Sequence, residues 1–293
     1  MLGEALSLGS ALSWALAVVL FKRALAHSPA ATNLFKNALA ILLLGATALA
    51  LGIPWPDRSP EDWTRLAVSG ICGIAIADTL FFASLSRVGA GFMGIIECAY
   101  APFVVLFSVL LLGEGLSLAF GLGALAVVGG VLIAGSGELA TTTSRKGLAR
   151  GFLMGIGSVA LMGFGIVLAK PALGTSHVVE ASLTRLLFGT AALAAWIAVR
   201  PRAREVFSIL SDRGAWRTLG PAAFVGTYVT MLLWIGGMKH AEASVSGVLC
   251  QLSTVFTLVL SALILKERLS RRHWVGAALA MVGALGIIGV QSA

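Results

Sequence analysis

The stretch Leu111-Leu112-Gly113-Glu114-Gly115-Leu116-Ser117 returns later in the chain as Ile264-Leu265-Lys266-Glu267-Arg268-Leu269-Ser270. The two glutamates are 153 residues apart (267 − 114), and the same offset carries Gly123-Ala124 onto Gly276-Ala277. A sequence that repeats itself at a fixed distance predicts two structurally related halves.

The composition is that of a membrane protein. Of the 293 residues, 58% are hydrophobic and only 12% are charged, and the mean hydropathy is +0.96. A soluble domain has about 25% charged residues, so the composition excludes a water-soluble fold for this chain. The pI of about 10.0 does not indicate nucleic acid, because the basic residues lie in short loops between apolar stretches. The three cysteines lie inside apolar stretches, so we expect no disulfide, metal site or cofactor.

Ten apolar stretches are each long enough to cross a bilayer as a helix, which takes roughly 17–25 residues. They lie at about residues 5–25, 34–53, 66–86, 91–112, 116–136, 150–169, 179–199, 217–237, 243–265 and 273–291. Helices are expected because lipid offers no hydrogen-bond partner to an open backbone.

The repeat divides these ten helices into two sets of five. We assign residues 1–137 to the first repeat, 138–149 to a linker and 150–293 to the second repeat. Gly9-Ser10 returns as Gly157-Ser158, with an offset of 148 (157 − 9). Five is an odd number, so equivalent ends lie on opposite sides of the bilayer. The sequence therefore predicts an all-α integral membrane protein of two inverted five-helix repeats around a central cavity.

Lysine and arginine are divided unequally between the two predicted membrane faces, with 16 of the 21 on one face. The other face holds Arg58, Arg65, Lys170, Arg185 and Lys239. Cytoplasmic loops carry the excess of basic residues. We therefore expect the basic face to be cytoplasmic and both termini to lie on the non-cytoplasmic side.

Several motifs resemble the EamA repeat of the drug/metabolite transporter superfamily. They are Ala99-Tyr100-Ala101-Pro102, Gly113-Glu114-x-Leu116-Ser117 and, in the second copy, Glu267-x-Leu269-Ser270; the second copy departs at Val255, where the first has Pro102. The resemblance implies a ten-helix carrier of the bacterial inner membrane, with a cavity lined by helices 1, 3, 4, 6, 8 and 9. Many such carriers export amino acids and other metabolites, and this chain resembles the YddG-like amino-acid exporters among them.

Asp78 and Glu97 are the acidic residues well inside the predicted spans. A carboxylate in hydrocarbon is costly and normally faces a cavity or a partner. In the repeat alignment Asp78 stands opposite Met231 and Glu97 opposite Cys250, so neither charge is duplicated. They could bind a substrate ammonium or a proton. The structural alternative is an ion pair with Arg87 or a place at a helix end.

Aromatic and amide side chains supply further candidates, because buried Tyr, Trp and Gln need hydrogen-bond partners. For Phe81 and Phe82 lipid-facing packing is the stronger alternative, and for the polar stripe on helix nine it is close helix packing. The predicted substrate-binding residues are Trp14, Asp78, Phe82, Glu97, Tyr100, Tyr228, Met231, Trp234, Gln251 and Thr254.

The duplicated residues are expected to belong to the scaffold. The glycine-rich helices five and ten should pack against each other or in a dimer. Glu114 and Glu267 should each cap the helix that follows it. Lys36 and Arg185 occupy equivalent positions, 149 residues apart (185 − 36). We interpret them as snorkelling to head groups, with a site for a substrate carboxylate as the alternative.

These features predict a secondary transporter working by alternating access, since no nucleotide-binding motif is present. Basic residues are expected near span ends, which disfavours strongly anionic substrates and favours a neutral or zwitterionic one such as an amino acid. Export of drugs or other metabolites is an alternative within this class. An intramembrane enzyme and a receptor that does not transport are alternatives from other classes. We expect a small-molecule substrate, surrounding lipid, and a monomer or weak homodimer.

Overall fold

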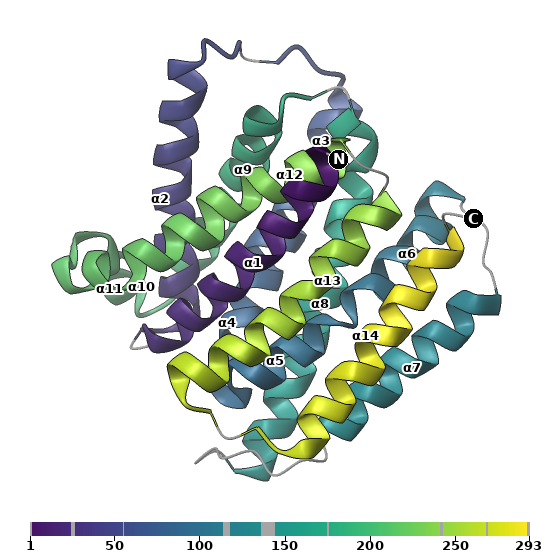
Figure 1. The fold of residues 1–293 in the computed structure, drawn as a ribbon. Coiled ribbons are helices and arrows are strands. Elements are labelled where there is room, and N and C mark those ends of the chain that lie inside the picture. The colour runs from purple at the N-terminus through teal and green to yellow at the C-terminus, as the bar shows by residue number, and fades with distance from the viewer. Residues whose placement is uncertain are drawn as a thin grey trace.

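The computed structural model describes residues 2–24, 27–54, 56–113, 118–135, 144–174, 176–240, 243–267 and 269–291. Within these ranges the chain forms helices and no strand (Figure 1). Seven of the helical segments are long and apolar enough to cross a membrane, and two shorter apolar stretches lie at Gly121–Gly130 and Leu249–Leu265. The fold is therefore the all-α membrane fold that the composition predicts.

The helical elements follow one another in ten successive segments across the described chain. The first repeat comprises α1 (Leu2–Arg23), α2 (Pro29–Ala50), α3 (Pro60–Gly70) continued by η1 (Ile71–Ala77) and α4 (Asp78–Val88), α5 (Ala90–Glu97) followed by α6 (Tyr100–Leu112), and α7 (Leu118–Gly135). The second comprises α8 (Arg145–Gly174), α9 (Val178–Ala198), α11 (Arg213–Ala223) continued by η3 (Phe224–Val229) and α12 (Thr230–His240), α13 (Ala243–Leu260) continued by η4 (Ser261–Leu265), and α14 (Arg271–Gln291). Two short elements, α10 (Ala203–Phe207) and η2 (Ser208–Ser211), connect α9 to α11.

The first helix of each half packs against helices of the other half. Helix α1 packs against α12 and α13 of the second half, and its repeat equivalent α8 packs against α4 and α6 of the first. Helix α2 lies against its own equivalent α9. Figure 1 places the N- and C-terminal ends toward the same end of the bundle, as expected for an even number of spans.

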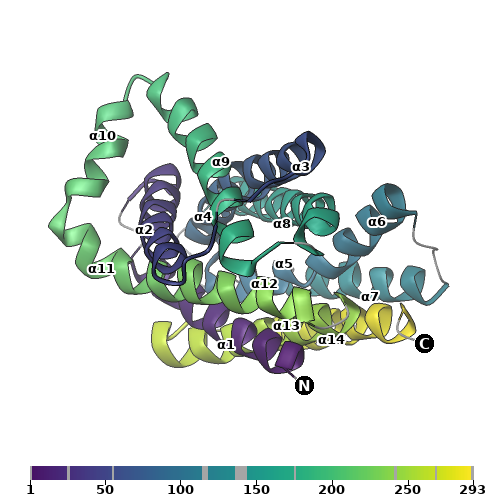
Figure 2. The ribbon, with the colours of Figure 1, turned by 90° about the horizontal axis from the view of Figure 1, so that it is seen from above.

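The glycine-rich helices α7 and α14 pack side by side at the edge of the bundle, far from α10 and α11 (Figures 1 and 2). A methyl group on Gly130 of α7 would come 2.5 Å from the Gly276 carbonyl oxygen of α14. The backbones approach this closely because the residues between them are small. The predicted packing of helices five and ten against each other is confirmed.

Two segments of π-helix occupy equivalent places in the two halves. Segment η1 contains Gly73 and segment η3 contains Gly226, and these glycines are related by the 153-residue offset (226 − 73). Short π-helical segments inside α-helices are frequent at functional sites. Here each one lies in the middle of its span, between two α-helical parts.

The fourth span is broken where the sequence predicts one helix over 91–112. Helix α5 ends at Glu97, and α6 begins at Tyr100 after a tight turn in which the Cys98 and Ala99 amides bond to carbonyls three residues back. Pro102 accounts for the break, since it lacks the N–H that would bond to the Cys98 carbonyl and its ring crowds that carbonyl. Val255 stands in its place in α13, which is continuous.

Candidate functional site

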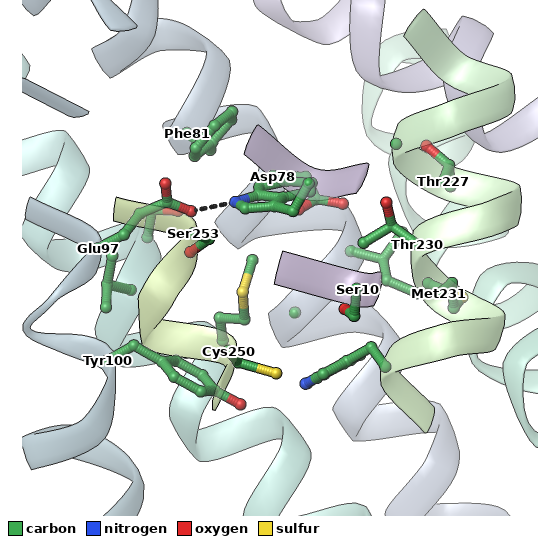
Figure 3. Close-up of a pocket in the computed structure, with 18 of the residues that line it drawn as sticks. Ser10, Asp78, Phe81, Glu97, Tyr100, Thr227, Thr230, Met231, Cys250 and Ser253 are labelled. Atoms are coloured by element: carbon green, nitrogen blue, oxygen red, sulfur yellow. Dashed lines mark hydrogen bonds between the residues drawn. The ribbon is translucent and has the colours of Figure 1, made fainter. Parts of the chain in front are cut away.

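A cavity of about 150 Å³ lies between the two halves (Figure 3). It is lined by Ser10, Ala11, Trp14, Lys36, Gly73, Ile74, Asp78, Phe81, Glu97, Tyr100, Ser158, Val159, Met162, Arg185, Gly226, Thr227, Thr230, Met231, Trp234, Cys250, Gln251 and Ser253. The family resemblance implies walls from spans 1, 3, 4, 6, 8 and 9. The structure adds span 2 through Lys36 and span 7 through Arg185.

The cavity lies on the pseudo-symmetry axis of the repeat. Each of its ten lining residues from the first half has its sequence equivalent on the wall from the second half. The pairs are Ser10/Ser158, Ala11/Val159, Trp14/Met162, Lys36/Arg185, Gly73/Gly226, Ile74/Thr227, Asp78/Met231, Phe81/Trp234, Glu97/Cys250 and Tyr100/Ser253. The positions are thus symmetric, and the unlike pairs make the chemistry asymmetric.

Seven of the ten residues predicted to bind substrate line this cavity. Phe82, Tyr228 and Thr254 do not line it. The Phe82 ring is buried against Phe21, with ring centroids 5.0 Å apart. The Tyr228 hydroxyl shares a 2.7 Å hydrogen bond with that of Thr47. Thr254 donates a 3.0 Å hydrogen bond to the Gly94 carbonyl and so joins α13 to α5.

The Asp78 carboxylate forms an ion pair with Lys36, whose Nζ lies 2.7 Å from Oδ2. The same Nζ donates to the Asn37 side-chain oxygen at 2.8 Å. Lys36 is buried, so its interpretation as a snorkelling residue is wrong. The alternative pairing of Asp78 with Arg87 is also wrong, because Arg87 donates to the Ala83 carbonyl on its own helix. The apolar pattern of span 2 does not indicate the helix rotation that points Lys36 inward.

Arg185, the repeat equivalent of Lys36, is only 2% exposed. Its Nε donates a 2.9 Å hydrogen bond to the Ser69 hydroxyl, and its guanidinium carbon lies 5.6 Å from the centroid of the Trp234 ring. Its Nη1 is buried without an acceptor among the described residues. The expectation that basic residues stay near span ends is therefore wrong for Lys36 and Arg185. Lys36 and Arg185 belong to opposite predicted membrane faces. Leaving both out of the count of basic residues does not change which face has the excess.

Glu97 lies at the end of α5, where the helix breaks. The Trp14 indole Nε1 donates a 2.6 Å hydrogen bond to its Oε1 (Figure 3). Its Oε2 is buried without a hydrogen-bond donor in the described part of the chain. The Tyr100 hydroxyl, one turn further on, is also buried and without a partner there. The site thus has unused hydrogen-bonding capacity on a cation, an anion and a hydroxyl.

Known proteins place the chain in a family. The model of the EamA-like transporter family matches residues 1–136 and 149–289. The chain belongs to the EamA-like transporter family. A solved crystal structure has the same fold, with a TM-score of 0.70 and 17% sequence identity over 97% of this chain and 95% of that one. A comparison with curated proteins finds no significant match.

In this EamA transporter, polar interactions join the two halves at each end of the bundle; each of these interactions is called a tie below. At one end Arg58 forms a buried ion pair with Glu180 and donates to the Ser176 hydroxyl at 2.6 Å. At the opposite end of the 60–88 span, the Glu267 carboxylate accepts hydrogen bonds from the Ala90 and Gly91 amides at 3.0 and 2.9 Å. Glu267 therefore caps α5 and not the helix that follows it, which corrects the prediction. Glu114 lies outside the described residues.

Repeat equivalence is the sequence signal that identifies cavity residues absent from the prediction, namely Phe81, Ser10 and Ser158. Phe81 lines the cavity opposite Trp234, so repeat equivalence to a predicted site residue identifies it. Ser10 and Ser158 belong to the duplicated Gly-Ser motif, and both line the same cavity. Lys36 and Arg185, a duplicated pair assigned above to the scaffold, line it too, so a duplicated residue can also belong to the site. Equivalent positions near an internal symmetry axis meet at the axis.

Proposed function

We propose that this EamA transporter is a secondary carrier that exports small zwitterionic metabolites, above all amino acids, across the bacterial inner membrane by alternating access. The observation that supports this proposal is the pair of unsatisfied charged groups in one cavity. Within the described part of the chain, Arg185 has a guanidinium nitrogen without an acceptor, and Glu97 has a carboxylate oxygen without a donor. Buried charges are costly unless they are paired, and a zwitterion offers a partner for each.

The charge balance of the cavity favours a solute without net charge. Lys36 and Arg185 are offset by Asp78 and Glu97, so the lining carries no net charge when all four side chains are ionised. A strongly anionic solute would gain from the two cations and lose to the two carboxylates. The rest of the wall is mostly apolar and includes Phe81 and Trp234, which suits an aliphatic or aromatic side chain.

Alternating access requires that the two ends open in turn. The Arg58–Glu180 ion pair and the Glu267 cap each join one half to the other, and they lie at opposite ends of the bundle. Opening either end by moving the halves apart breaks the tie at that end. We infer that each tie stabilises the closed form of its own end.

Counterflow in proteoliposomes tests this function. Vesicles containing the purified protein are loaded with an unlabelled amino acid, and entry of the same labelled amino acid is followed. A carrier gives a transient, saturable accumulation that protein-free vesicles lack. Absence of counterflow for all standard amino acids would rule out this substrate class. Accumulation of an apolar drug in its place would favour efflux of that class.

A further inference from the structure

The equivalent basic residues of the two halves have different partners in the cavity. In the first half Lys36 on α2 pairs with Asp78 on α4 at 2.7 Å. In the second half, the equivalents of these two residues are Arg185 and Met231, at offsets of 149 (185 − 36) and 153 (231 − 78). Both line the same cavity. The second half thus keeps the cation of the ion pair and has a thioether in the place of its carboxylate.

The consequence is a buried guanidinium with an incomplete set of acceptors. Arg185 is 2% exposed, its Nε donates to Ser69, and its Nη1 has no acceptor among the described residues. Trp234 faces the guanidinium at 5.6 Å, which stabilises a cation but accepts no conventional hydrogen bond. Asp78 lines the same cavity, yet its ion pair is with Lys36.

A second buried donor lines the same cavity. The Tyr100 hydroxyl is buried without a partner in the described residues, and Tyr100 and Arg185 both belong to the cavity wall. Tyr100 comes from α6 of the first half and Arg185 from α9 of the second. A phenolic O–H and a guanidinium N–H both donate, so the group that satisfies both is an acceptor. A carboxylate has two oxygens for this purpose and also neutralises the charge.

We propose that Arg185 and Tyr100 form a carboxylate-binding subsite, and that the substrate's carboxylate supplies the partner that Met231 does not. The ion pair that the first half makes internally is made in the second half only when substrate is bound. The recognition of a carboxylate rests on Arg185, Tyr100 and Met231 alone. The identity of the solute as an amino acid rests on the function proposed above.

The decisive variant is Met231→Asp, because it restores the missing carboxylate within the protein. Its side chain would pair with Arg185 and exclude the carboxylate of the ligand. It also adds a negative charge to the cavity, which favours an amine. Met231→Asn is the matched control, since it has nearly the same shape without the charge.

Binding is measured in detergent by ligand-induced thermal stabilisation and calorimetry, with three leucine-related probes. Leucine has both charged groups, isoamylamine lacks the carboxylate and 4-methylpentanoate lacks the ammonium; phenylalanine, phenethylamine and 3-phenylpropanoate form a second set. In Met231→Asp we expect affinity for the amino acid and the acid to fall roughly 30-fold or more, as when one partner of a buried charge pair is lost. Affinity for the amine should hold or rise. Met231→Asn should stay within about threefold, and Tyr100→Phe should lose about tenfold for the acid.

The selectivity switch distinguishes the subsite from a loss of folding, because a misfolded variant would lose the amine as well. Unchanged affinity of Met231→Asp for the amino acid and the acid would overturn the subsite. So would failure of the wild-type protein to bind any amino acid or either acid. If the acids bind and the switch occurs, but no amino acid shows counterflow, the subsite stands and the proposed function fails.

Discussion

The fourth and ninth spans are repeat equivalents, yet one is broken and the other is continuous. In the first half the chain stops at Glu97, turns and restarts at Tyr100, whereas α13 runs from Ala243 to Leu260. The difference follows from Pro102, whose place is taken by Val255 in the ninth span. The same alignment puts Glu97 opposite Cys250. The span that has a proline in place of a backbone N–H donor is therefore also the span that places a carboxylate in the cavity.

The break also changes the electrostatics of that carboxylate. Glu97 is the last residue of α5, where the helix dipole places negative partial charge. A carboxylate there is repelled by the helix end, and among the described residues only the Trp14 indole donates to it, at one oxygen. Both effects attract a cation to this point. The continuous α13 has no such end at Cys250 and offers no comparable attraction.

The largest effect is expected from Glu97→Gln, which keeps the shape of the side chain and removes its charge. Transport of an amino acid should fall roughly 30-fold or more in kcat/KM, the order expected when one partner of a buried charge pair is lost. Counterflow rates over a range of substrate concentrations measure it. Glu205→Gln, at an exposed glutamate in α10, is the control and should transport like the wild type. Equal rates in both variants would remove Glu97 from the site.

Val255→Pro would introduce into the ninth span the break that the fourth has. Val255 is 39% exposed, so the cost should come from the backbone and amount to about 3 kcal/mol of stability or more. Thermal unfolding in detergent measures it, with Val255→Ala as the control for the lost side chain. A melting temperature equal to that of the control would show that α13 tolerates a break and that Pro102 alone does not explain the fourth span.

Glu267→Gln weakens the cap that holds the start of the broken helix. The carboxylate accepts two amide hydrogen bonds at Ala90 and Gly91, and loss of its charge should cost about 1–2 kcal/mol. Hydrogen–deuterium exchange should rise in residues 90–97 and stay unchanged in α13. Uniform exchange across both spans would contradict a local role for this cap.

Thr254→Val tests the contact between the two spans and should have the smallest effect. Thr254 donates to the Gly94 carbonyl at 3.0 Å, and removal of a buried hydrogen bond of this kind costs about 1 kcal/mol. The melting temperature should fall slightly while substrate affinity stays the same, because Thr254 does not line the cavity. A marked loss of affinity would return Thr254 to the substrate site.

Patterns along the chain were enough to predict the ten spans, the two halves and much of the cavity. Span limits depend on hydropathy, which is a local property of the sequence. Asp78, Glu97 and Trp234 could be chosen because a polar group in hydrocarbon needs a partner. Lys36 and Arg185 were misread because a basic residue about two turns into a span can point to head groups or inward. That choice depends on the rotation of α2 and α9 against their neighbours.

The duplication, and with it the equivalence of residues in the two halves, follows from the order of residues along the chain. Those offsets already pair Asp78 with Met231 and Glu97 with Cys250. The packing of the helices establishes that the pairs meet around one cavity, that Lys36 reaches Asp78, and that Arg185 has no carboxylate partner among the described residues. Equivalence is set by position along the chain, whereas burial and pairing of a charge depend on side chains from other helices. In this protein those side chains come from both halves.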